Sequence, residues 1–217
     1  TSDRVGLIAR VLSELHYDAV GVGAQDLQLG DDFFGPLAES KVPVAYAGPK
    51  SREGAIPYRI KDVNGVKVGI VSFGGVSLSG QDGYDARKSL YSAYKAARDE
   101  SDILILLDQE NIADAEWIER NGARFGAPDI VIGGISKVSL KEPVVFGTTY
   151  IVPTFMQTKA LGVVDIEIGP DKKLSVNYRS VELGADVAEQ PDIAKLVTEF
   201  MGKVKSATQP ATIPNVP

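Results

Sequence analysis

Three short apolar runs each lead into residues that could form a chemical site. In chain order they are Ala19–Val22 followed by Ala24, Gln25 and Asp26, Ile103–Leu107 followed by Asp108 and Gln109, and Ile130–Ile132 followed by Ile135, Ser136 and Lys137. Continuous apolar runs of this length are typical of parallel strands that are buried on both faces. Open α/β sheets bind their ligands beyond the carboxyl ends of such strands. We therefore expect three neighbouring, mainly parallel strands whose ends converge on one cleft.

The residue types in this expected cleft allow two kinds of chemistry. Asp26, Asp108 and Glu110 offer carboxylates that could hold a single metal ion, as in an atypical phosphohydrolase. Without a metal, the same polar groups would satisfy backbone groups at the strand ends or bind a small anion. The composition argues against catalysis by histidine or cysteine, since the chain has one histidine, His16, and no cysteine.

The composition is that of an ordinary globular domain. The chain has 217 residues and a net charge of −6, and it has no basic stripe, which argues against a nucleic-acid partner. No run approaches the roughly 18 apolar residues of a membrane span. We expect one domain over residues 1–205 and a proline-rich tail or linker over 206–217.

Local patterns predict the elements that would position the cleft. The helices are expected over 3–15, 84–99, 111–121 and from Pro191, with a helical turn over Asp31–Glu39. Further strands are expected over Val42–Ala47, Val144–Phe155, Leu161–Ile168 and Leu174–Leu183. The pair Asn64-Gly65 between the runs Ile56–Val63 and Val66–Phe73 is typical of a tight type I′ hairpin.

At the same residues the chain resembles the calcineurin-like metallophosphatases, and within them the 5′-nucleotidase branch. Tyr17–Val20 and Gly23–Asp26 are similar to the family's Gly-Tyr-Asp-Ala-Val and Gly-Asn-His-Asp/Glu. Leu106–Gln109 is similar to its strand ending in Ser-His, and Gly133–Lys137 to its Gly-Gly-His-Ser-His. The resemblance covers most of residues 5–183 in the family's order. It implies an α/β fold, a layered αββα sandwich, here expected without the strands that carry the family's two earliest motifs.

The resemblance also implies that the family's two-metal chemistry is lost. The positions of its metal ligands hold Ala24, Gln109, Ile135 and Lys137, and the position of its catalytic histidine holds Gln25. Of the motif side chains that align, Asp26 is kept, and in the family this residue orients the catalytic histidine. An alkyl side chain coordinates nothing, and a protonated lysine repels a divalent ion.

These comparisons predict a catalytically inactive domain with no metal and no cofactor, which acts as a binding or scaffold module. The alternatives are a phosphoesterase or 5′-nucleotidase with an atypical metal site, and a nucleotide-binding module without hydrolysis. The resemblance further implies export to the periplasm or outside the cell. It also implies a multihaem c-type cytochrome as a partner. Without the family's first strands a sheet edge or an apolar face would be open, so we expect another polypeptide or a second copy to pack there. In this reading Lys137 replaces the metal charge and pairs with Asp26, Asp108 or both.

Overall fold

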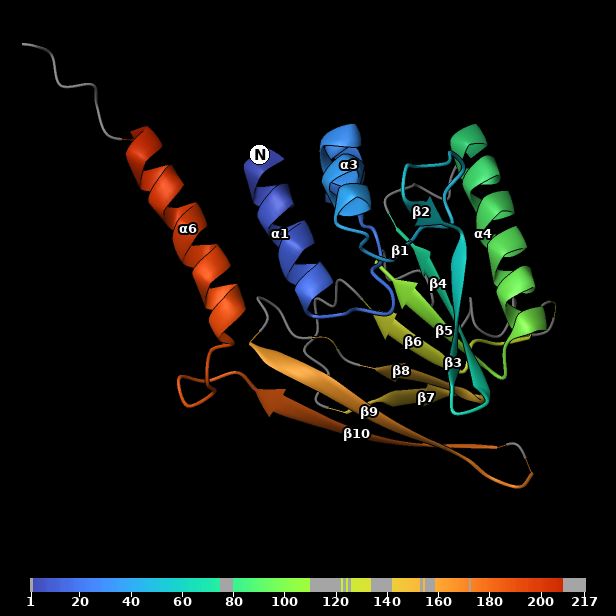
Figure 1. Ribbon diagram of the computed structural model, residues 1–217. Helices are drawn as coiled ribbons and strands as arrows, with labels where there is room; N and C mark the ends of the chain where they lie inside the picture. The colour runs from blue at the N-terminus through green and yellow to red at the C-terminus, as the bar shows by residue number, and fades with distance from the viewer. Residues whose placement is uncertain are drawn as a thin grey trace, which may run out of the picture.

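A six-stranded mixed sheet and a two-stranded ribbon form the β layers of the computed structural model (Figure 1). The structure describes residues 2–74, 80–109, 122, 124, 126–133, 142–152, 154, 159–171 and 173–208. The helices are α1 (Ser2–Glu14), α2 (Ala24–Leu29), α3 (Asp31–Glu39), α4 (Gly80–Glu100) and α6 (Pro191–Thr208). The strands are β1 (Val44–Ala45), β2 (Ala55–Ile56), β3 (Tyr58–Val63), β4 (Val66–Phe73), β5 (Ile103–Asp108), β6 (Ile130–Gly133), β7 (Val144–Phe146), β8 (Thr149–Val152), β9 (Ala160–Ile168) and β10 (Leu174–Glu182).

The large sheet has the strand order β3-β4-β5-β6-β8-β7. Its central strands β4, β5, β6 and β8 run parallel, and β3 and β7 are antiparallel edge strands. The turn between β3 and β4 has positive φ at Asn64 (55°) and at Gly65 (87°), which is the geometry of a type I′ turn. The hairpin and the parallel β5–β6 pair therefore confirm the sequence-based expectations.

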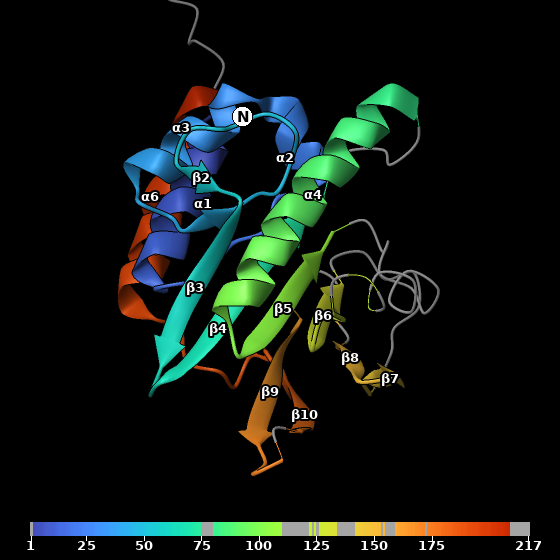
Figure 2. The same cartoon turned by 90° about the vertical axis from the view of Figure 1, so that its right-hand side faces the viewer.

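Helix α4 covers one face of this sheet (Figure 2). Its buried side chains recur with helical spacing at Ala86, Leu90, Ala93, Tyr94 and Ala97, and they form a core with strand residues of β4, β5 and β6. Since side chains of a strand alternate between its faces, the buried members Leu104 and Leu106 place the even-numbered residues of β5 on the α4 side.

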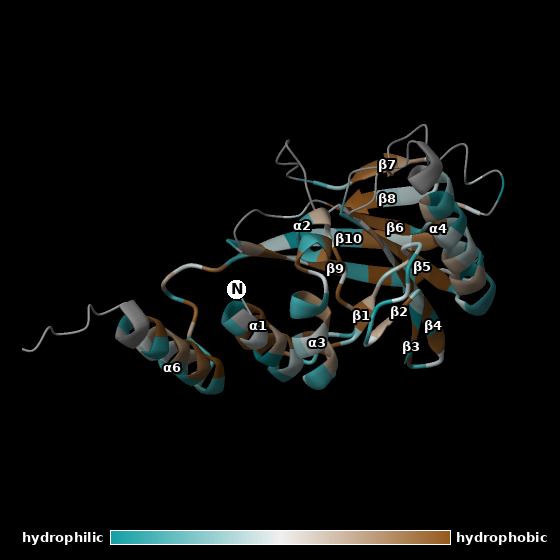
Figure 3. Ribbon diagram, turned by 90° about the horizontal axis from the view of Figure 1, so that it is seen from above, coloured by the Kyte–Doolittle hydropathy of each residue, from teal (hydrophilic) through white to brown (hydrophobic). Residues whose placement is uncertain are grey.

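A second core lies around α1 and α3. Val5 and Ala9 of α1 pack with Phe34 and Leu37 of α3 and with Val22. The β9–β10 ribbon lies on the side of the large sheet opposite α4, and α6 stands beside α1 (Figure 3). In the described part of the chain, no helix is both long and apolar enough to cross a membrane.

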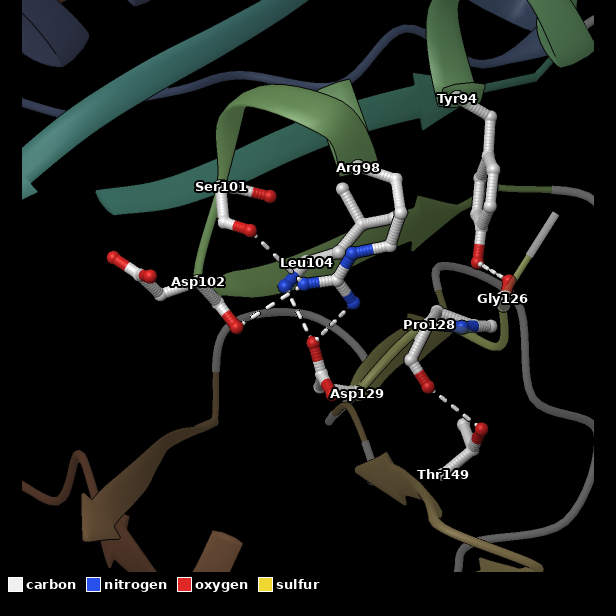
Figure 4. Close-up of polar contacts among 9 residues, drawn as sticks. All are labelled: Tyr94, Arg98, Ser101, Asp102, Leu104, Gly126, Pro128, Asp129 and Thr149. Atoms are coloured by element: carbon white, nitrogen blue, oxygen red, sulfur yellow. Dashed lines mark hydrogen bonds and ion pairs between the residues drawn. The ribbon is translucent and has the colours of Figure 1, made fainter. Parts of the chain in front are cut away.

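A polar cluster ties α4 to the amino ends of β5, β6 and β8 (Figure 4). Arg98 of α4 forms an ion pair with Asp129 at 2.7 Å, and the same carboxylate oxygen accepts the backbone N–H of Leu104 at 2.7 Å. Tyr94 donates to the carbonyl of Gly126 at 2.7 Å, and burial raises the pKa of this tyrosine strongly. The cluster therefore fixes the helix at the end of the sheet opposite the expected cleft.

One predicted strand is wrong and another is divided by a turn. Ala19–Val22 does not form a sheet strand, since it makes a single parallel bridge between Val20 and Val44. It crosses the face of the large sheet instead, where Gly21 lies close to the side chains of Ser72 and Leu107. The expected strand Val144–Phe155 is the hairpin β7–β8, because the chain turns back after Phe146 at Gly147, which has a φ of 60°. The expected helix over 111–121 lies outside the described residues.

Candidate functional site

Asp26 lies in the first turn of the short helix α2 rather than at the end of a strand. Its Oδ2 accepts the backbone N–H of Gly23, the N-cap residue, at 2.9 Å. This bond satisfies a backbone group that the start of a helix leaves without an intrahelical partner. Ala24 and Asp26 are half-buried, while Gln25 is exposed. Asp26 therefore performs the local capping task that the simpler interpretation of the sequence assigns to such residues.

Gln109 is the predicted site residue that the structure places next to the α2 segment. Its backbone N–H continues the ladder beyond β5 by donating to Phe73 O at 3.0 Å. A Cβ added to Gly21 would lie 3.1 Å from Gln109 Nε2 and 2.7 Å from Ser72 Oγ, and one added to Gly23 would lie 3.9 Å from Gln109 Oε1. A Cβ on Gly74 would overlap the carbonyl oxygen of Val22 and lie 2.7 Å from Gln109 Cβ. The Gln109 side chain thus fills a space bordered by three glycines.

Asp108 belongs to the other face of the sheet. It has the same parity in β5 as Leu104 and Leu106, and its parallel neighbour Phe73 is also part of the core under α4. Only 2% of Asp108 is exposed, and it makes a polar interaction. Asp26 and Gln109 therefore meet at Gly23, whereas Asp108 points toward the α4 side.

The remaining predicted site residues, Ile135, Ser136 and Lys137, lie outside the described residues, as does Glu110. The salt link of Lys137 with Asp26 or Asp108 accordingly stays a prediction.

The described side chains at these strand ends do not by themselves form the ligand set of a two-metal centre. Ala24 presents a methyl group, Asp26 is engaged with Gly23, and Gln109 offers a neutral amide packed over glycines. Two-metal hydrolysis needs a set of donor side chains that holds both ions. Among the residues that the structure describes, no three histidine, cysteine or acidic side chains come together to hold a metal.

Comparisons with known proteins identify the architecture. No protein-family model and no curated protein matches the chain. Among solved structures, the sulfate thiohydrolase SoxB of Thermus thermophilus superposes with a TM-score of 0.73 at 17% identity, over 92% of this chain and 39% of its own. The NAD nucleotidase NadN of Haemophilus influenzae gives 0.68 at 15% identity, over 94% and 48%. A Staphylococcus aureus protein assigned as a 5′-nucleotidase gives 0.61 at 12% identity, over 89% and 44%.

The chain has the calcineurin-like metallophosphatase fold. This confirms the fold that the motif resemblance predicted. The chain spans less than half the length of each of these structures. At these identities the likeness concerns the metallophosphatase fold alone, so the activities of the three proteins are not carried over to this chain.

The structure also contains a cavity that the sequence did not lead us to expect. A cavity of about 1010 Å³ lies between the segment 46–58 and helix α4, and none of the predicted site residues lines it. Its charged side chains are Lys50, Arg52, Asp85 and Lys88. A signal was present in the sequence, since the basic pair around Ser51 stands between two prolines in a connection without apolar periodicity.

Proposed function

We propose that this chain is a non-catalytic metallophosphatase-fold domain that acts as a binding or scaffold module. The observation that carries the proposal is the position of Gln109. Its side chain packs over Gly21, Gly23 and Gly74 at the strand end where the family resemblance places a metal-binding histidine. A space filled by a neutral amide leaves a metal-activated water without its usual ligands.

The exposed apolar residues of the β9–β10 ribbon support a role in protein binding. Leu161 and Val181 are directly opposite each other in the antiparallel register, so they share one face, and they are 52% and 36% exposed. A two-stranded ribbon alone is marginally stable in water, and contiguous exposed apolar groups are typical of interaction surfaces. A protein partner, either a second copy or a multihaem cytochrome, belongs to this proposal, as does export from the cytoplasm.

Metal analysis of the purified chain, combined with a phosphatase assay, tests the proposal. We expect no stoichiometric zinc, manganese or iron, and no turnover of p-nitrophenyl phosphate when these ions are added. Stoichiometric metal together with turnover would overturn it in favour of a phosphoesterase with an atypical site. Substitution of Asp26 by Asn should then abolish that turnover, because the alternative single-metal site would use the Asp26 carboxylate.

Nucleotide binding is measured separately by calorimetry with AMP. Binding without turnover would make the domain a nucleotide-binding module, which is the third function that the sequence allows.

A further inference from the structure

The cavity between the segment 46–58 and α4 carries unbalanced positive charge. Lys50, Arg52 and Lys88 line it against a single carboxylate, Asp85, which gives the lining a net charge of +2 in a chain whose net charge is −6. A concave site of one sign concentrates field lines and attracts ligands of the opposite sign. The contrast with the acidic remainder of the chain sets this hollow apart.

The three cations have no carboxylate partner within the described part of the chain. The ion pairs found there join Lys61 to Asp18, Lys95 to Asp99, Arg98 to Asp129 and Lys173 to Asp171. Lys50, Arg52 and Lys88 take part in none of these pairs. Unpaired charge gathered at a hollow indicates a binding site more strongly than charge on a flat surface does.

Arg52 is held in place at the cavity wall. Its guanidinium carbon lies 5.6 Å from the centre of the Phe34 ring, a cation–π arrangement, and its buried Nε has no hydrogen-bond partner. A guanidinium fixed in this way is preorganised for the planar oxygen pairs of carboxylates and phosphates.

Tyr46 supplies an unpaired hydroxyl to the same hollow. The residue is 6% exposed and its Oη makes no hydrogen bond to a described residue. Burial raises its pKa, and the charge of Arg52 partly opposes this shift, so the hydroxyl keeps its proton at neutral pH and can donate it. The Tyr46 hydroxyl lines the cavity and could donate to a ligand oxygen there.

Hydroxyl and apolar groups complete the wall. On α4, Asp85, Lys88, Ser89 and Ser92 follow one helical stripe, while Leu27, Ala55 and Pro57 add apolar surface from the other side. The volume falls at the upper end of the range for small-molecule sites. Charged, hydroxylic and apolar walls together fit an organic molecule with an anionic group better than they fit a bare ion.

We propose that this cavity binds a small organic dianion, a phosphate monoester or a dicarboxylate, through Arg52, Lys88 and Lys50. Two negative charges on the ligand match the net charge of the lining. The inference deepens the proposed binding function and rests on it. It places the ligand at the flank of α4, away from the strand ends where the metallophosphatase resemblance would place chemistry.

Isothermal titration calorimetry of the full chain at low ionic strength tests the inference with glycerol 3-phosphate, succinate and neutral glycerol. We expect saturable binding of one or both dianions and none of glycerol, and the preferred dianion identifies the anionic group. Arg52→Gln and Lys88→Gln should each weaken binding about tenfold or more, as for the loss of one charge-assisted hydrogen bond. Tyr46→Phe should weaken it by about threefold to tenfold.

Lys95→Gln is the matched control, because Lys95 lies on the same helix, carries the same charge and does not line the cavity. We expect its affinity to stay within about twofold of the wild type. Equal weakening by Lys95→Gln and Lys88→Gln overturns the inference, as does the absence of saturable binding of both dianions up to about 10 mM. Lys88 is exposed, so its replacement keeps the test valid if Arg52→Gln fails to fold.

The outcome is separable from that of the proposed function. Metal content and phosphate-ester turnover depend on the strand ends, whereas the titration depends on the flank of α4. A domain that hydrolyses esters and still binds the dianion through Lys88 would refute the first proposal alone. A metal-free domain without turnover that binds neither dianion would refute the second alone.

Discussion

The ion pair between Arg98 and Asp129 allows a quantitative prediction of stability. The carboxylate of Asp129 accepts two short hydrogen bonds, one from the guanidinium and one from the backbone N–H of Leu104, both at 2.7 Å (Figure 4). The side chains are 21% and 22% exposed, so water screens the pair only in part. Arg98 also donates to the carbonyl of Asp102 at 3.1 Å, which anchors the end of α4.

Replacing Asp129 by Ala removes the one oxygen that accepts both hydrogen bonds. The Leu104 N–H then lacks a partner at the start of a buried strand, and the guanidinium loses its counter-charge. A charge-assisted hydrogen bond contributes about 1.5–3 kcal/mol, and an unsatisfied buried donor costs about 1–3 kcal/mol. Allowing for partial exposure, we expect a loss of about 2–4 kcal/mol in the free energy of unfolding. Asp129→Asn keeps an amide oxygen for Leu104, so we expect about 1–2 kcal/mol.

Urea denaturation followed by circular dichroism measures these differences. The matched control is Asp99→Ala, since Asp99 also pairs with a cation of α4 but is 61% exposed. We expect this variant to lose no more than about 0.5 kcal/mol, as is usual for exposed pairs. The reasoning is refuted if Asp129→Ala and Asp99→Ala destabilise the protein equally, or if Asp129→Ala unfolds at the wild-type urea concentration.

Three further predictions concern the packing of a glycine, the pH dependence of stability and the charge of Lys137. Gly74→Ala should lose about 1–3 kcal/mol because its Cβ would overlap Val22, whereas Gly35→Ala, which has open space inside α3, should be neutral or slightly stabilising in the same urea assay. Tyr94 keeps its proton in the folded state because burial raises its pKa, so the stability that it contributes is complete below the unfolded value near about 10 and falls as the pH rises above it. Tyr94→Phe should therefore lower the free energy of unfolding by about 1 kcal/mol at pH 7. Between about pH 9 and 11, urea titrations should show that the free energy of unfolding falls less steeply with pH in this variant than in the wild type, and parallel declines would contradict this assignment. Lys137→Met should lower the melting temperature if Lys137 neutralises a strand-end carboxylate, and an unchanged melting temperature would end that hypothesis.

The parts of the fold that could be predicted from the sequence are those in which local chemistry decides. Asn64-Gly65 specifies its turn through two positive φ angles, and the apolar runs of β5 and β6 specify buried parallel strands. The motif resemblance added the order of these pieces, and the superpositions confirm it.

The segment Ala19–Val22 shows why local pattern was insufficient elsewhere. An apolar run indicates burial, but burial is available on the face of a sheet as well as inside it. Gly21 removes the side chain that would keep the segment away from Ser72, so the run packs across the sheet instead of pairing in it. The expectation that Asp108 and Gln109 share one cleft failed for a related reason. Neighbouring residues of a strand point to opposite faces of the sheet.

The basic pair Lys50 and Arg52 is visible in the sequence, but the cavity beside α4 depends on tertiary placement. Lys50 and Arg52 are far in sequence from Lys88, and only the return of the chain through β3 and β4 brings them to one wall. Each is unremarkable alone as a surface cation. Their common lack of acidic partners becomes visible only when the ion pairs of the described residues are known.

The buried residues of the two cores follow one another along the chain. The buried members of the core around α1 and α3 end at Tyr46, and those of the core under α4 begin at Ala47. During synthesis, the residues of the first core therefore leave the ribosome before β4 and β5 exist to form the second. Slow hydrogen exchange should accordingly fall into two groups of amides, one for each core.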